Sequence, residues 1–113
     1  MTITEKAHGL ITIVSLKGSL LGEPDTTAFR KTVYRCIERG EKQVVLDLGG
    51  LKAINSAGLG VLVSALSSLR NKNGDLTLAS LSDKVHALMV VTHLIMVFRV
   101  YDTVARAVAS LER

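Results

Sequence analysis

Aromatic residues are scarce in this chain of 113 residues: only 4% are Phe, Tyr or Trp, and Trp is absent. The core must therefore be built from Val, Leu, Ile, Ala and Met, a mixture that suits a sheet covered by helices. Hydrophobic residues still make up 48% of the chain and charged residues 21%, which is far from the composition of a disordered segment. About two thirds of the unfolded surface is buried at this length, so we expect one domain over residues 1–113.

Cysteine and the usual metal-ligand spacings are also lacking. Cys36 is the only cysteine, so it cannot form an intramolecular disulfide, and its place on an apolar helical stripe predicts a buried thiol. No C-x-x-C or H-x-x-x-H pattern occurs, and we expect no metal and no other cofactor. His86 and His93 would share a face only on one unbroken helix, and we interpret them as ordinary polar positions.

Three kinds of targeting or binding segment are missing. The most apolar stretch, Val85–Phe98, is shorter than the roughly 20 residues of a membrane span, so no membrane insertion is expected. Residues 1–6 lack the features of a signal peptide, which favours a cytoplasmic location. The net charge of +4 is spread as +2 in residues 1–40, +1 in 41–80 and +1 in 81–113. Without a basic stripe or interleaved aromatics, nucleic-acid binding is not expected.

Hydrophobic periodicity predicts strands that alternate with helices. The expected strands are Ile3–Lys6, Leu10–Leu16, Gln43–Leu48, Leu76–Ala79 and Val97–Val100. The expected helices are Asp25–Arg39, Ala57–Asn73, Asp83–Val91 and a last helix with Asp102 as its N-cap. The first two strands form a hairpin, residues 19–24 form a loop, and Pro24 lies in the first helical turn. This order predicts an α/β fold: an N-terminal hairpin that leads into a mostly parallel mixed sheet covered by about four helices.

The turn after the central strand Gln43–Leu48 reads Asn55-Ser56-Ala57-Gly58-Leu59-Gly60. Open parallel sheets bind their ligands at the carboxyl ends of strands. We interpret Ser56 as the N-cap of the second helix, beside unpaired N–H groups and the positive end of the helix dipole. A phosphate on Ser56 would be well accommodated there. The plainer alternative is that Ser56 is only a cap and that the two glycines only form a tight turn.

Three stretches of the chain resemble the STAS domain family, named for sulfate transporters and anti-sigma factor antagonists. They are Asp25-Thr26-Thr27-Ala28, Val44-Val45-Leu46-Asp47-Leu48 and Asn55-Ser56-Ala57-Gly58-Leu59-Gly60. The last is similar to the family signature Asp-Ser-(Ser/Thr/Ala)-Gly-Leu-Gly, whose serine is the phosphorylated residue. The resemblance covers nearly the whole chain and is closest to the antagonist type. Asn55 stands where the family most often has Asp.

This resemblance implies a regulatory binding protein and not an enzyme. An antagonist of this type binds an anti-sigma factor, often itself a serine kinase, and so releases a sigma factor. Phosphorylation of Ser56 would end the complex, and a serine phosphatase would restore it. The resemblance places partner binding at Asn55, Ser56, Ala57, Gly58, Leu59 and Gly60, together with Asp25. The alternative within the family is an unphosphorylated adaptor subunit of a membrane transporter or of another signalling complex.

Catalytic interpretations of Ser56 have less support. A serine-hydrolase elbow, G-x-S-x-G, needs glycine where Ile54 stands, and none of the three histidines has a recognisable catalytic partner. The chain also lacks the G-x-x-x-x-G-K-[ST] loop that binds ATP phosphates. Any phosphoryl transfer therefore belongs to its partners.

Overall fold

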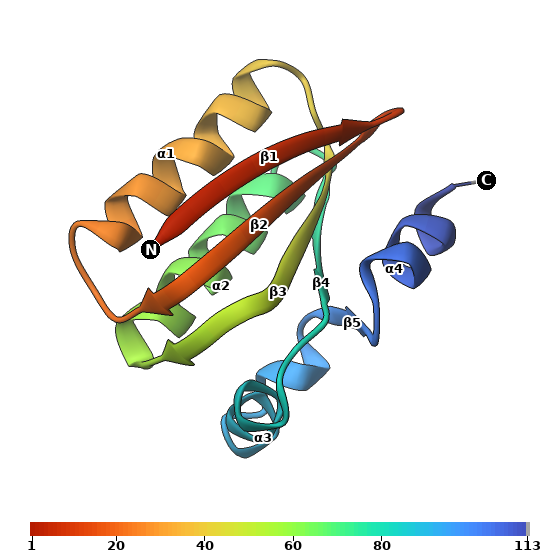
Figure 1. Ribbon diagram of the computed structural model, residues 1–113. Coiled ribbons are helices and arrows are strands. Elements are labelled where there is room, and N and C mark those ends of the chain that lie inside the picture. The colour runs from red at the N-terminus through yellow and green to blue at the C-terminus, as the bar shows by residue number, and fades with distance from the viewer. Residues whose placement is uncertain (113) are drawn as a thin grey trace.

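The computed structural model describes residues 1–112, which form a five-stranded sheet with helices on both faces (Figure 1). The strands are β1 (Thr2–His8), β2 (Ile11–Leu20), β3 (Gln43–Ile54), β4 (Asp75–Ala79) and β5 (Arg99–Tyr101). The helices are α1 (Asp25–Glu38), α2 (Ser56–Arg70), α3 (Asp83–Val91) and α4 (Val104–Leu111), with a 3₁₀ helix η1 (Leu94–Met96). The predicted α/β fold is confirmed.

The strands lie side by side in their order along the chain, β1-β2-β3-β4-β5. β1 pairs with β2 antiparallel, and every other pair is parallel. The hairpin therefore forms one edge of the sheet, and β3 lies at its centre. Val44, Val45 and Leu46 are fully buried on β3, because helices cover both faces of a strand in this position.

The core has two layers on opposite faces of the sheet. The larger one joins α1 and α2 to the sheet through Phe29, Leu62 and Leu69, and the smaller one joins α4 through Ala107 and Val108. Cys36 is fully buried in the larger layer, so the expectation of a buried thiol is confirmed. α3 contributes Val85 and Met89 to the same layer.

β2 and β3 are both longer than the sequence indicated. β2 reaches Leu20, where a loop from Ser19 was expected, and β3 reaches Ile54 and not Leu48. Their parallel pairing continues through two shifts of register. A side chain at Gly50 would lie 2.6 Å from Lys17 Cγ. In the sequence, Gly49 and Gly50 look like the end of a strand. In the structure, Gly50 allows β2 and β3 to lie close together.

The structure places the two histidines of the C-terminal third and corrects the expected cap of its last helix. His93 has a left-handed backbone with φ 63° and lies after the end of α3, so it shares no helix with His86. The N-cap of α4 is Thr103 and not Asp102: its hydroxyl accepts a hydrogen bond from Arg106 N at 3.1 Å. None of the helices in residues 1–112 is long and apolar enough to cross a membrane.

Candidate functional site

The N-cap of α2 is Asn55, which corrects the interpretation of Ser56 as the cap. Asn55 Oδ1 accepts a hydrogen bond from Gly58 N at 3.1 Å, and Ser56 is the first helical residue. Asn and Ser are both favoured at this position, and the extended conformation of Asn55 decides between them. The Ser56 side chain is exposed and takes no part in the cap.

The amide of Asn55 also connects two segments that are distant in sequence. Its Nδ2 donates a hydrogen bond to the carbonyl oxygen of Leu21 at 2.7 Å. An Asp at this position would keep the acceptor for the cap but has no N–H to donate. Asn55 therefore ties the start of α2 to the loop between β2 and α1, a contact that the usual Asp of the signature could not make.

The two glycines of the turn have different environments. A side chain at Gly58 would lie 2.4 Å from Leu20 O and 2.6 Å from Ile54 Cγ1. Only glycine fits there, because α2 begins in contact with the ends of β2 and β3. Gly60 has no atom within 4 Å of the same position and is exposed. Packing explains the first glycine and not the second.

The predicted partner-binding residues of α2 divide into an inward and an outward group. Gly58 and Leu59 are buried and hold the first turn of α2 against the sheet. The outward group is Ser56, Ala57 and Gly60, and all three are exposed. We call these three residues the Ser56 face. It is small in side-chain size and carries no charge.

Asp25 is the first residue of α1 and is half-buried. The hydrogen bond from Asn55 reaches Leu21, in the loop that precedes Asp25, and not Asp25 itself. In the same loop Glu23 receives hydrogen bonds from Thr27 N, at 2.8 Å, and from the hydroxyls of Thr26 and Thr27. These bonds lower the pKa of Glu23. The start of α1 is thus ordered beside the start of α2.

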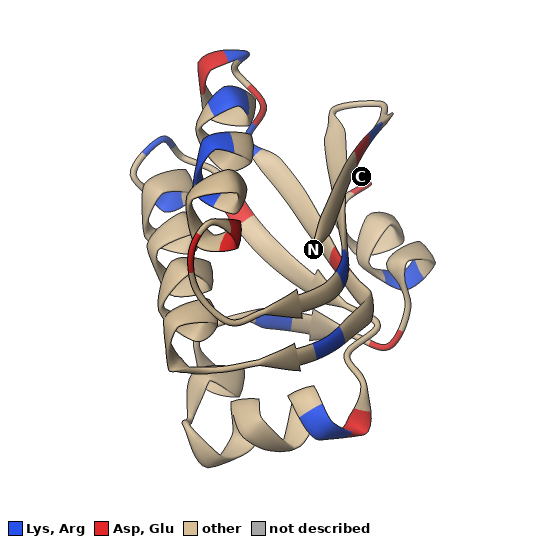
Figure 2. Ribbon diagram, turned by 60° about the vertical axis from the view of Figure 1, so that its left-hand side comes forward, with Lys and Arg blue, Asp and Glu red and all other residues tan. Residues whose placement is uncertain are grey.

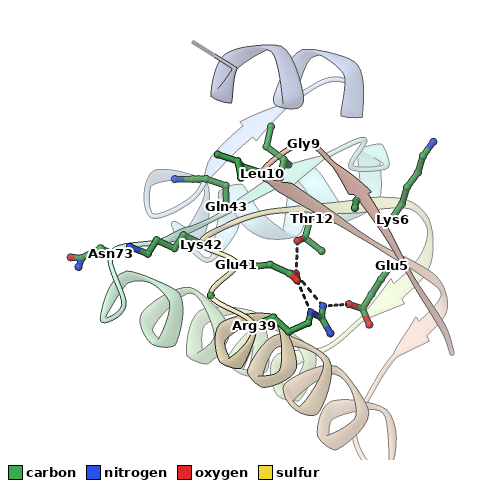
Figure 3. Close-up of a pocket in the computed structure, with 13 residues that line it drawn as sticks. Glu5, Lys6, Gly9, Leu10, Thr12, Arg39, Glu41, Lys42, Gln43 and Asn73 are labelled. Atoms are coloured by element: carbon green, nitrogen blue, oxygen red, sulfur yellow. Dashed lines mark hydrogen bonds and ion pairs between the residues drawn. The ribbon is translucent and has the colours of Figure 1, made fainter.

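A second polar cluster lies at the other end of the sheet, around a cavity of about 680 Å³ (Figure 3). The guanidinium of Arg39 pairs with Glu5 at 2.8 Å and with Glu41 at 2.5 Å. Thr12 Oγ1 donates to Glu41 Oε1 at 2.6 Å. The bond from Arg39 outweighs partial burial and lowers the pKa of Glu41 to about 2.

This cluster brings Cys36 close to two carboxylates. Potential ligand atoms of Glu5, Cys36 and Glu41 lie within 4.8 Å of one another, but both carboxylates are already paired with Arg39. Burial first, and then the two carboxylates, raise the pKa of the Cys36 thiol to about 12. A neutral thiol beside a bound guanidinium is a poor metal site. Sequence spacing gave no signal for this cluster, because its residues come from four separate segments.

Fold and turn together define a class: an α/β domain in which an exposed serine opens the helix after the central strand. The STAS domain family model matches residues 2–107, and the chain belongs to this family. The resemblance found in the sequence is therefore confirmed.

Several similar proteins of known name are anti-sigma factor antagonists or carry that name provisionally. The chain is 26% identical over 113 residues to the anti-sigma F factor antagonist of Paenibacillus polymyxa, covering 99% of this chain and 96% of that protein. A Thermotoga maritima protein provisionally named an anti-sigma factor antagonist is 30% identical over 86 residues, or 75% of this chain and 76% of that protein. A crystal structure of a Thermotoga maritima protein with the same provisional name has a TM-score of 0.90 at 26% identity, covering 98% and 95% of the two chains.

Proposed function

We propose that this chain is an anti-sigma factor antagonist that binds an anti-sigma factor through the Ser56 face and so frees a sigma factor. The observation that carries the proposal is Gly60. Glycine inside a helix costs about 0.5–1 kcal/mol relative to alanine, and nothing in the surrounding packing requires it here. Close approach of a partner backbone to the N-terminal end of α2 accounts for a glycine at this exposed position.

Phosphorylation of Ser56 would act as the off switch. The hydroxyl is exposed at the first position of a helix, where a phosphate is well accommodated in the free protein. In a complex that covers the Ser56 face, the same group would lose its hydration and weaken binding. Asn55 adds no negative charge beside the phosphate. The switch would thus change affinity without unfolding the domain.

The chemistry in this scheme belongs to the partners. An anti-sigma factor with kinase activity would transfer the phosphate from ATP to Ser56 Oγ, and a serine phosphatase would remove it by hydrolysis. The chain itself supplies a folded surface and a hydroxyl. The loop tied to Asn55 extends that surface toward Asp25, which we propose as a further contact for the partner.

The test compares Ser56→Ala with Ser56→Asp, and Ser67→Asp serves as a control at the other end of the same helix, where the side chain is also exposed. Binding to purified anti-sigma factors of the source organism is measured by titration calorimetry. We expect Ser56→Ala to bind within about twofold of wild type, and Ser56→Asp to bind more weakly by about 1–3 kcal/mol. The control should bind like wild type.

Phosphate incorporation is followed in the same samples with ATP, intact mass and peptide mapping. Wild type should gain one phosphate on Ser56, and Ser56→Ala none. Equal affinities of Ser56→Ala and Ser56→Asp would refute the switch. Phosphate on another residue, or none with every anti-sigma factor tested, would favour the unphosphorylated adaptor.

A further inference from the structure

An open groove of about 470 Å³ lies between the C-terminal part of β3 and α3. Its wall is mainly apolar, and within residues 1–112 its only charged lining residues are Lys52 on β3 and Lys84 on α3. Asp83 precedes Lys84 but does not line the groove. The apolar lining residues are Ala53, Ile54, Val85, Ala87, Leu88 and Val91. None of these residues belongs to the Ser56 face.

Large apolar side chains remain exposed on α3 and in the segment that follows it. Val91 is 75% exposed and Val90 47%, and in the segment that follows α3, Met96 is 84% exposed. The charged residues of α3, Asp83 and Lys84, both lie in its first turn (Figure 2). Val91 lines the groove. Single exposed apolar residues are ordinary, but a mainly apolar groove with a largely exposed Val91 in its wall fits a protein interface.

The groove adjoins the proposed binding surface directly. Ile54 lines the groove and is followed at once by Asn55, the cap of α2, and by Ser56. α3 lies at the end of the sheet where β3 runs into α2 (Figure 1). A partner that covers the Ser56 face and extends past Asn55 can therefore reach the groove as well.

We propose that this groove binds an amphipathic segment of the anti-sigma factor, with apolar side chains in the groove and acidic side chains against Lys52 and Lys84. The proposal rests on the proposed function. The two ammonium groups belong to opposite walls, so a segment that lies between them can pair with both. Acidic residues are the complement because no carboxylate lines the groove within residues 1–112. The apolar wall selects aliphatic or aromatic side chains between the acidic ones.

The first experiment reverses the charge of the groove. Lys52→Glu/Lys84→Glu is compared with Lys6→Glu/Lys42→Glu, which changes the charge equally at the other end of the sheet. All four lysines are exposed, so both variants should fold, and circular dichroism checks this. Dissociation constants for the anti-sigma factor that binds wild type are measured from 50 to 300 mM KCl, a range chosen to vary screening.

We expect the groove variant to bind at least about tenfold more weakly at low salt, and its affinity to depend less on salt than that of wild type. The control should remain within about threefold. A second pair, Val91→Gln in the groove and Leu10→Gln at the tip of the β1–β2 turn, tests the apolar wall with side chains that are 75% and 93% exposed. Only Val91→Gln should lose about fivefold or more.

The outcomes separate this inference from the proposed function. Wild-type binding that neither groove variant weakens more than its control would overturn the groove inference and leave the proposed function standing. No wild-type binding to any anti-sigma factor would overturn both. Self-association of the free chain that Val91→Gln abolishes, or groove-dependent flotation with vesicles of anionic phospholipid, would assign the groove to a second copy or to a membrane surface and overturn the inference.

Discussion

The two ends of the sheet use polar residues in opposite ways. At the end near the β1–β2 turn, Arg39 is paired with Glu5 and Glu41, and Thr12 completes the set. At the other end, the Ser56 face is uncharged, exposed and small in side-chain size. The charged groups at the first end find their ion-pair and hydrogen-bond partners within the chain, so they contribute to this fold. The second leaves room for another protein, which suits a binding surface.

Gly58 and Gly60 show the same contrast, since one packs inside the chain and the other leaves room for a partner. The variant with the largest expected effect on stability tests this difference. Gly58→Ala places a methyl group 2.4 Å from Leu20 O, and overpacking of this kind costs about 3 kcal/mol. Gly60→Ala meets no atom within 4 Å and should stabilise the helix by up to about 1 kcal/mol. Urea denaturation of both variants measures the difference. Similar destabilisation by the two alanines would show that Gly60 is also a packing residue.

Gly60→Ala also tests whether Gly60 serves binding and not stability. The variant should be as stable as wild type or more so, yet bind the anti-sigma factor more weakly, because its methyl group lies on the Ser56 face. Unchanged affinity would place the partner away from this turn of α2.

The next effect concerns Asn55, which joins the start of α2 to the loop before α1. Asn55→Ala loses the cap and the bond to Leu21 O and should cost about 1–2 kcal/mol. Asn55→Asp keeps the cap acceptor and should cost less. Asn71→Ala, at the exposed other end of α2, is the matched control. Thermal denaturation at pH 7 ranks the variants, and a harmless Asn55→Ala would contradict the cap.

The smallest effect concerns the paired end of the sheet. The pKa of Glu41 is lowered from an ordinary 4.5 to about 2, so its contribution to stability is complete above about pH 5 and is lost as the pH falls toward 2. After screening by solvent, we expect this contribution to be about 1 kcal/mol. Glu41→Gln should therefore flatten the decline in unfolding free energy over that range.

The control for this titration is Glu38→Gln, which removes an exposed carboxylate near the end of α1. Glu38 takes part in none of the ion pairs found within residues 1–112, so this variant separates the loss of a carboxylate from the loss of the pair with Arg39. A curve for Glu41→Gln that matched wild type from pH 5 to 2 would show that the pairing with Arg39 contributes nothing to folding.

Much of the fold follows from the sequence, because hydrophobic periodicity reports which side chains are buried. The apolar run at Val44–Leu46 predicted the central strand, and the stripe containing Cys36 predicted its burial. The predicted ends of β2 and β3 were less accurate. Gly49 and Gly50 look like a strand end, but the close approach of Lys17 is a tertiary contact that no local pattern encodes.

The sequence predicted where the turn before α2 lies, but not the detail of its hydrogen bonds. Asn55 and Ser56 are both good caps, so the residue type could not decide which one accepts the bond from Gly58 N. The bond from Asn55 to Leu21 O and the contact of Gly58 with Leu20 O depend on β2 lying beside β3. The groove beside α3 was also missed, because its lysines belong to different elements.

The hydrogen bond between Asn55 and Leu21 joins residues 34 positions apart, and this separation has a consequence for when the proposed switch at Ser56 could operate. The Ser56 hydroxyl acquires its position only after β2 has paired with β3, a non-local event that follows the closure of a long loop. An unfolded or nascent chain carries the same serine but does not present the same surface. A kinase that recognises that surface would modify only folded molecules, so the proposed regulation would act on the folded pool alone.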